Sequence, residues 1–150
     1  MTKAANEQFA SALRNLPHQP PFRFIDRIEA LSDDAARGAW VVRGDEDFLR
    51  GHFPGRPLVP GVLITEAAAQ LAGVVAHRRV GGDGDGMLVL SDARFRRPVK
   101  PPATITLEVT SIGQFDSIHR FDFEASVDGV RVANGSVGVS LQIARKDETS

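Results

Sequence analysis

The feature that most constrains the fold is an apolar stretch over residues 61–80, beginning near Gly61. It has the length and composition of an α-helix, and its apolar side chains point in nearly every direction around the helix axis. These side chains are Val62, Leu63, Ile64, Ala67, Ala68, Ala69, Leu71, Ala72, Val74 and Val75. A helix that is apolar on all sides is a buried helix. The rest of the chain must therefore enclose it.

Segments rich in Val, Ile, Phe and Thr, typical of strands, lie on both sides of this helix in the sequence. They are predicted at 22–31, 37–43, 87–95, 103–112, 117–127 and 130–143. Asp33-Asp34 and Asp128-Gly129 supply turns between neighbouring strands, and a short amphipathic helix is predicted at residues 6–16. Helices do not alternate with the strands, so the pattern predicts an α+β fold with an antiparallel sheet wrapped around the central helix.

The bulk composition is that of an ordinary globular domain. The 150 residues, 42% hydrophobic and 25% charged, suit a single domain over residues 1–150. A net charge of −1 argues against a nucleic-acid binder, and the absence of cysteine excludes disulfides and thiolate metal sites. The sequence has no apolar signal-peptide core and no run of about 18 apolar residues that would span a membrane. A cytoplasmic protein is therefore expected.

The candidate catalytic groups lie where a loop leads into the central helix. The loop, GHFPGRPLVPG at residues 51–61, carries His52 between prolines and glycines, and Glu66 is the single carboxylate of the helix that follows. A loop histidine and a glutamate on a buried helix are suited to general acid–base catalysis. The alternatives are a structural histidine and a polar stripe that Glu66 shares with Gln70, four residues later on the same face.

Gly61 adds a third element to this candidate site. Free backbone N–H groups at the start of a helix favour negative charge, so Gly61 is suited to a carbonyl oxygen that becomes enolate-like. The alternative is that Gly61 only lets the chain turn into the helix. Spacing alone does not decide whether His52, Glu66 and Gly61 converge.

The segment GHFPGRPLVPGVLITEAAAQLAG, beginning at Gly51, resembles the active-site signature of the 3-hydroxyacyl-[acyl carrier protein] dehydratases of fatty acid synthesis, the FabZ type. Two flanking segments also resemble this family, LPHQPPFRFIDRI at 16–28 and ARFRRPVKP at 93–101. The resemblance covers most of the chain in the expected order. It implies the hot-dog fold, in which an antiparallel sheet wraps around a long helix and two subunits pair through their sheets.

The resemblance also implies roles for the three candidate residues. His52 matches the family's catalytic histidine, Glu66 its catalytic carboxylate, and Gly61 the position whose backbone N–H meets the thioester carbonyl. In that family the histidine and the carboxylate of one site come from opposite subunits, which implies a homodimer with shared active sites. Whether the dimers assemble further into a trimer of dimers is left open. Glutamate rather than aspartate at position 66 favours dehydration without isomerisation.

The implied reaction eliminates water from a (3R)-3-hydroxyacyl thioester to give a trans-2-enoyl thioester. His52 would remove the α-proton while Glu66 protonates the departing hydroxyl group, without a metal or redox cofactor. The substrate would be carried on the phosphopantetheine of acyl carrier protein, and its acyl chain would need an apolar tunnel. The tunnel candidates are Phe53, Leu58, Leu63 and Phe95.

Positive residues near the end of the 87–95 strand are candidates for binding an acidic carrier protein. These residues are Arg94, Arg96, Arg97 and Lys100, and Arg56 beside His52 is a further candidate. The alternative is a solvated loop with one or two structural arginines. The glycine-rich run GGDGDG at 81–86 resembles a fragment of a calcium-binding loop, but it is too short and lacks the distal glutamate that such a loop needs. A flexible surface loop is therefore predicted.

Three other functions stay open from the sequence: a coenzyme A-dependent enoyl hydratase, a thioesterase of the same fold, and a non-catalytic acyl-binding module. The joint presence of His52 and Glu66 favours the dehydratase. A thioesterase would not need the histidine loop, and a binding module would need neither residue.

Overall fold

The structure is a computed structural model that describes residues 3–14, 16–81 and 84–143. Its elements are α1 (Lys3–Arg14), β1 (Arg27–Leu31), β2 (Ala35–Val42), the 3-10 helix η1 (Asp47–Gly51), α2 (Gly61–Val80), β3 (Gly84–Phe95), β4 (Ala103–Phe115), β5 (Ile118–Val127) and β6 (Val130–Ile143). Within the described residues, neither helix is long and apolar enough to cross a membrane. The cytoplasmic location expected from the sequence stays a prediction.

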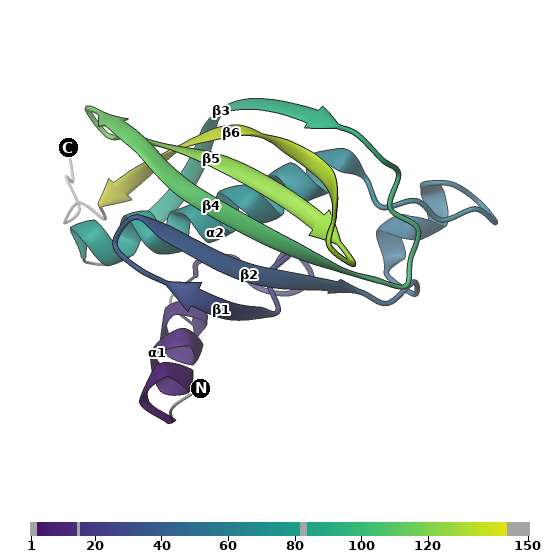
Figure 1. Ribbon diagram of the computed structural model, residues 1–150, viewed down its shortest axis with the longest axis horizontal. Helices are drawn as coiled ribbons and strands as arrows, with labels where there is room; N and C mark the ends of the chain where they lie inside the picture. The colour runs from purple at the N-terminus through teal and green to yellow at the C-terminus, as the bar shows by residue number, and fades with distance from the viewer. Residues whose placement is uncertain (1–2, 15, 82–83, 144–150) are drawn as a thin grey trace, which may run out of the picture.

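The strands form one antiparallel sheet in the order β1-β2-β4-β5-β6-β3. The sheet curves over α2, which runs along its inner face, while α1 projects away from the β1 side (Figure 1). The turns predicted between β1 and β2 and between β5 and β6 are present. This arrangement confirms the prediction of an α+β hot-dog fold.

Burial of α2 explains why its sequence is apolar on all sides. The helix contacts five of the six strands, β2 to β6, and Ala68, Leu71, Ala72 and Val75 have no exposed surface. Burying a side chain such as Leu71 contributes roughly 1.5–3 kcal/mol to stability. Gly38 allows β2 to lie close to α2, because it has no side chain at this point of contact. A Cβ atom there would lie 3.3 Å from the Leu71 side chain and 3.0 Å from the Arg27 carbonyl oxygen.

The central helix begins and ends where the sequence predicts, but two other elements do not. Residues 22–26 were predicted to be strand and instead form an irregular segment, because Phe24 donates its backbone N–H to the side chain of Gln70. The glycine-rich run was predicted to be a loop to Gly86, yet β3 already begins at Gly84, where β6 offers backbone partners as far as Ile143. The first helix, Lys3–Arg14, lies slightly earlier than the predicted 6–16.

Strand β3 is an edge of the sheet and carries an apolar surface. Met87, Leu88, Val89 and Leu90 are each between 37% and 52% exposed, and β3 pairs only with β6 among the described residues. Free strand edges with apolar side chains are sites for pairing with another chain. The contact between two subunits through their sheets stays a prediction.

Stability is expected to fall in mild acid because of His119. Its side chain is 2% exposed, and burial, with the charge of Arg79 and the proximity of His77, lowers its pKa below the ordinary value of 6.5. Below pH 6.5 the unfolded chain takes up a proton at this residue that the folded chain does not, so unfolding becomes easier as the pH falls toward the folded-state pKa.

This prediction can be measured by urea unfolding at several pH values between 7.5 and 5. The variant His119→Asn should show a weaker pH dependence of the free energy of unfolding. Between the folded and unfolded pKa values of His119, the unmodified protein should lose up to about 1.4 kcal/mol more of its free energy of unfolding per pH unit than the variant does. Identical slopes for the two proteins would contradict the assignment.

Candidate active site

His52 lies in a loop that is held by its own backbone. It directly follows η1, in the segment between β2 and α2 that projects from one end of the sheet (Figure 1). Leu58 donates its N–H to the carbonyl oxygen of His52 at 2.8 Å, and Phe53 and Arg56 exchange two backbone hydrogen bonds of 3.1 and 2.9 Å. The loop therefore presents the imidazole from a fixed position.

The protonation of the His52 ring follows from its neighbours. Nδ1 lies 2.7 Å from the carbonyl oxygen of Leu58, and a carbonyl oxygen only accepts, so Nδ1 carries the hydrogen of the neutral ring. Nε2 then keeps its lone pair and is the nitrogen that can act as a base. The ring also stacks on Phe53, with centroids 4.3 Å apart.

The turn before η1 is fixed by Glu46. Its carboxylate accepts hydrogen bonds from the backbone N–H groups of Arg43 at 2.9 Å and Gly44 at 2.8 Å. Burial acts to raise the pKa of Glu46, but these backbone donors outweigh it and hold the pKa below its ordinary value. The carboxylate thus stays charged and closes the turn that leads toward His52.

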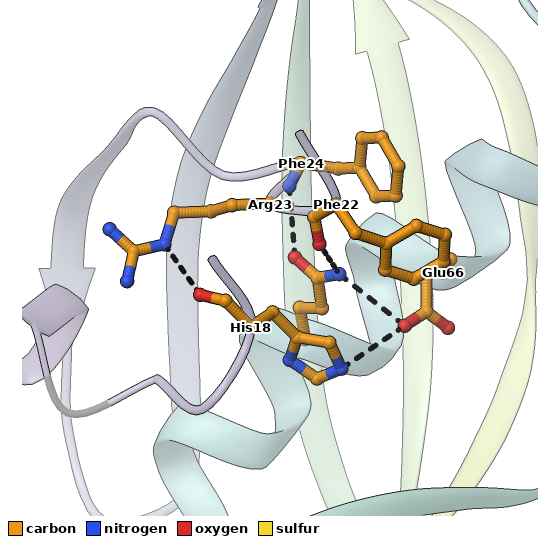
Figure 2. A network of polar contacts seen from close by, with 6 residues as sticks. His18, Phe22, Arg23, Phe24 and Glu66 are labelled. Carbon is orange, nitrogen blue, oxygen red and sulfur yellow. Dashed lines mark hydrogen bonds and ion pairs between the residues drawn. The ribbon is translucent and has the colours of Figure 1, made fainter. Parts of the chain in front are cut away.

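Glu66 lies in the second turn of α2, and nitrogens of two other side chains approach one of its oxygens. Gln70 Nε2 donates to Glu66 Oε1 at 3.3 Å, and His18 Nε2 lies 3.5 Å from the same oxygen (Figure 2). The side chain of Glu66 is 18% exposed and that of His18 is 25% exposed. The polar stripe expected for Glu66 and Gln70 is therefore real, and it forms part of the candidate site.

Gln70 is fixed by the backbone of a distant segment. Its Oε1 accepts the N–H of Phe24 at 2.9 Å, and its Nε2 donates to the carbonyl oxygen of Phe22 at 3.0 Å. The amide is 2% exposed and these two contacts leave it one orientation, in which Nε2 also faces Glu66. The chain between β1 and α1 is thereby attached to α2 beside the carboxylate.

His52 and Glu66 are not brought together within one chain. No hydrogen bond or ion pair joins them among the described residues. Glu66 and His18 border a cavity of about 30 Å³ between α2 and residues 16–18. The His52 loop borders a separate hollow of about 570 Å³, lined by Phe53, Arg56, Pro57, Leu58, Lys100 and Pro101. This separation is what a site shared between two subunits would require.

Gly61 begins α2 and lies under the ring of Phe95. A Cβ atom at position 61 would lie 2.8 Å from that ring, so only glycine fits without displacing Phe95. Of the four tunnel candidates, Phe53 and Phe95 are about half exposed, and Leu58 and Leu63 are partly buried. None of the four lines the cavity beside Glu66, which is bordered instead by residues such as Leu16, Gly73 and Leu88.

The positive residues predicted to bind a carrier protein do not form one cluster in the structure. Lys100 and Arg56 line the hollow beside the His52 loop. Arg94 instead borders a polar depression with Glu108 and Arg131 on the outer part of the sheet. Arg96 donates to Asn134 Oδ1 at 2.7 Å, and Arg97 is exposed. Only Arg56 and Lys100 therefore remain together near a candidate catalytic group.

The glycine-rich run offers no metal site in its described part. Its residues 82–83 lie outside the described residues, and elsewhere in the described chain no three His, Asp or Glu side chains gather as a metal would need.

Reasoning from the sequence missed the contact between His18 and Glu66. It lies 48 residues from Glu66 in the sequence, and only the LPHQPPFRF segment, at 16–24, hinted that this region belongs with the site.

Comparison with known proteins places the chain in a family. Residues 16–136 match the model of the FabA-like domain. The chain is 39% identical to the 3-hydroxyacyl-[acyl-carrier-protein] dehydratase FabZ of Rhizobium rhizogenes, over 98% of each chain, and 40% identical to FabZ of Agrobacterium fabrum, over 86% of each. A chain of the dehydratase heterocomplex ApeI:P from Xenorhabdus doucetiae has the same fold, with a TM-score of 0.73 and 22% identity, covering 89% of this chain and 91% of that one. The chain belongs to the FabZ-type dehydratases of the FabA-like family.

Proposed function

We propose that this protein eliminates water from (3R)-3-hydroxyacyl thioesters on acyl carrier protein, giving trans-2-enoyl thioesters in fatty acid biosynthesis. The observation that carries the proposal is the pair of groups around the start of α2. Among the described residues, Nε2 of His52 has no hydrogen-bond partner, while Glu66 on the buried helix accepts a hydrogen bond from Gln70 and lies 3.5 Å from His18 Nε2. One supplies a base and the other an acid, as an elimination requires.

The proposed chemistry divides among three groups. His52 Nε2 takes the proton from the α-carbon, and the electrons left behind move toward the thioester carbonyl. The backbone N–H of Gly61, which has no hydrogen-bond partner among the described residues, donates to the carbonyl oxygen as it becomes negative. Glu66 gives its proton to the C3 hydroxyl group, which leaves as water while the double bond forms. No metal or redox cofactor takes part, so a chelator is expected to leave the rate unchanged.

We further propose that two chains build each site. Within the described residues β3 pairs only with β6 and is an apolar edge, and pairing two such edges would continue the sheet from one chain into the next. Within one chain Glu66 borders one cavity, and other residues of the loop that carries His52 border another. A symmetric dimer would supply His52 from one chain and Glu66 from the other, giving two equivalent sites.

The function is tested first with the unmodified protein. Water addition to crotonyl thioesters is followed by the loss of the enoyl absorbance, with the acyl group on acyl carrier protein and on coenzyme A. Turnover with both, and a higher kcat/KM on the carrier protein, is the expected result. Preference for coenzyme A would favour the hydratase, release of free thiol would favour the thioesterase, and binding without turnover would favour the non-catalytic module.

Carrier recognition is expected to depend on Arg56 and Lys100. Both line the hollow beside the His52 loop, where positive charge would attract the acidic carrier. The double variant Arg56→Glu/Lys100→Glu should raise KM for the carrier-bound substrate by about tenfold or more, with much less effect on a small pantetheine thioester. The charge reversal Arg14→Glu, at the exposed end of α1, serves as the control. Equal effects on both substrates would contradict a carrier-specific role.

A further inference from the structure

We propose that His18 is a positioning residue for Glu66. Together with Gln70 it holds Oε1 of the carboxyl group, so that Oε2 is the oxygen that gives the proton to the departing hydroxyl. The inference rests on the proposed dehydratase function and deepens it, because it assigns separate tasks to the two oxygens of the acid.

The first support is that two side-chain nitrogens approach the same oxygen of Glu66. Gln70 Nε2 and His18 Nε2 lie 3.3 and 3.5 Å from Glu66 Oε1, and among the described residues no donor is bonded to Oε2 (Figure 2). A protonated carboxyl group carries its hydrogen on the oxygen that is not accepting, because an accepting oxygen turns its lone pairs toward the donors. The proton is therefore expected on Oε2.

The second support is that both donors are held in place. Gln70 is fixed by the backbone of Phe22 and Phe24. Arg23 restrains the backbone of His18, because its Nε donates a hydrogen bond to the His18 carbonyl oxygen at 3.0 Å. Nδ1 of His18 is buried and has no hydrogen-bond partner in the described part of the chain. The approach to Glu66 is thus the single polar contact of the imidazole there.

The consequence for the reaction appears when Glu66 loses its proton. Negative charge then develops on the carboxylate, and both donors stabilise it. Hydrogen bonds to charged groups are stronger than neutral ones. The His18 contact of 3.5 Å is long for a hydrogen bond, and such contacts in unliganded sites tighten when substrate is bound. His18 therefore acts on the rate of the step and not on the binding of substrate.

The test compares His18→Leu with His18→Gln in the dehydration of a 3-hydroxybutyryl thioester. Leucine removes the donor and should lower kcat by about 10- to 100-fold with KM within about twofold. Glutamine places an amide nitrogen near the position of Nε2 and should restore most of the rate. Gln19→Ala, an exposed neighbour in the same segment, should match the unmodified protein.

A second comparison shows whether His18 works through Glu66. If it does, adding His18→Leu to Glu66→Gln should cause little further loss, because the two effects share one mechanism. Thermal unfolding and gel filtration verify that each variant is folded and assembled. Should His18→Leu fail to fold, His18→Asn serves in its place, since its shorter side chain does not reach Glu66.

The outcomes separate this inference from the proposed function. An active protein that Glu66→Gln inactivates, but that keeps its full kcat with His18→Leu or His18→Asn, would overturn the role of His18 and leave the dehydratase standing. Losses that multiply fully in the double variant would also overturn it. Absence of turnover in the unmodified protein would overturn the proposed function, and the role of His18 with it.

Discussion

Replacing Glu66 with glutamine, or His52 with alanine, is expected to lower kcat/KM for dehydration by about 10³-fold or more, since a positioned acid or base each contributes about 10²- to 10⁴-fold. Glutamine keeps an oxygen that accepts the hydrogen bonds of His18 and Gln70 and removes only the acidic proton. His52→Ala removes the hydrogen bond from Nδ1 to Leu58 but keeps the three backbone hydrogen bonds of the 51–58 loop, so it should keep its fold. The assay is enoyl absorbance with carrier-bound substrate.

Mixed dimers of these two variants provide the sharper test. A dimer that contains one His52→Ala chain and one Glu66→Gln chain has one site with both native groups and one site with neither. Chains with different affinity tags can be produced together and purified through both tags in succession. If each site draws His52 and Glu66 from opposite chains, this mixed dimer should recover about half the activity of the unmodified dimer.

Two results would contradict the shared site. Either variant alone retaining most of its activity would remove that residue from the mechanism. An inactive mixed dimer, formed from folded chains, would mean that both groups act within one chain. That second arrangement would require His52 to reach Glu66 of its own chain, where Glu66 and the His52 loop border different cavities.

The second large effect is expected from a charge on the free edge of the sheet. Val89 lies at the irregularity between Leu88 and Leu90 in β3 and is 39% exposed. Lysine there would place a charge where two edges should meet, and charged edge residues prevent strand pairing. Val89→Lys is expected to be a monomer by analytical ultracentrifugation and to lose activity by about 100-fold or more, because in the proposed shared site a lone chain would lack one of the two groups.

Val130→Lys is the matched control. Val130 is 46% exposed and begins β6 at the turn from β5, away from the free edge. It receives the same substitution and should keep both the oligomeric state and the activity. A Val89→Lys protein that stays assembled and active would show that β3 is not the contact between chains.

Much of this fold could be predicted from the sequence, because its strongest signals are local. The central helix is apolar on all sides, so its burial and its bounds, Gly61–Val80, follow from composition. The turn at Asp128-Gly129 likewise follows from residues that favour it. The loop of His52 could be located because prolines and glycines mark it in the sequence.

The remainder depends on contacts between distant residues. Residues 22–26 alternate as a strand would, but the N–H of Phe24 is taken by Gln70, 46 residues later. The glycines that begin β3 favour a loop, and pairing with the end of β6 overrides that preference. The contact of His18 with Glu66 has no local signature, so only the folded chain shows it.

The hydrogen bond between Phe24 and Gln70 also allows motion at the site to be measured without substrate. The N–H of Phe24 is donated to Gln70, and Gln70 in turn holds Glu66. Exchange of that backbone hydrogen with deuterated water therefore occurs when the 16–24 segment lifts from α2 and takes His18 away from Glu66. The exchange rate of this one amide, measured by NMR, thus reports how often that segment leaves the acid in the resting protein.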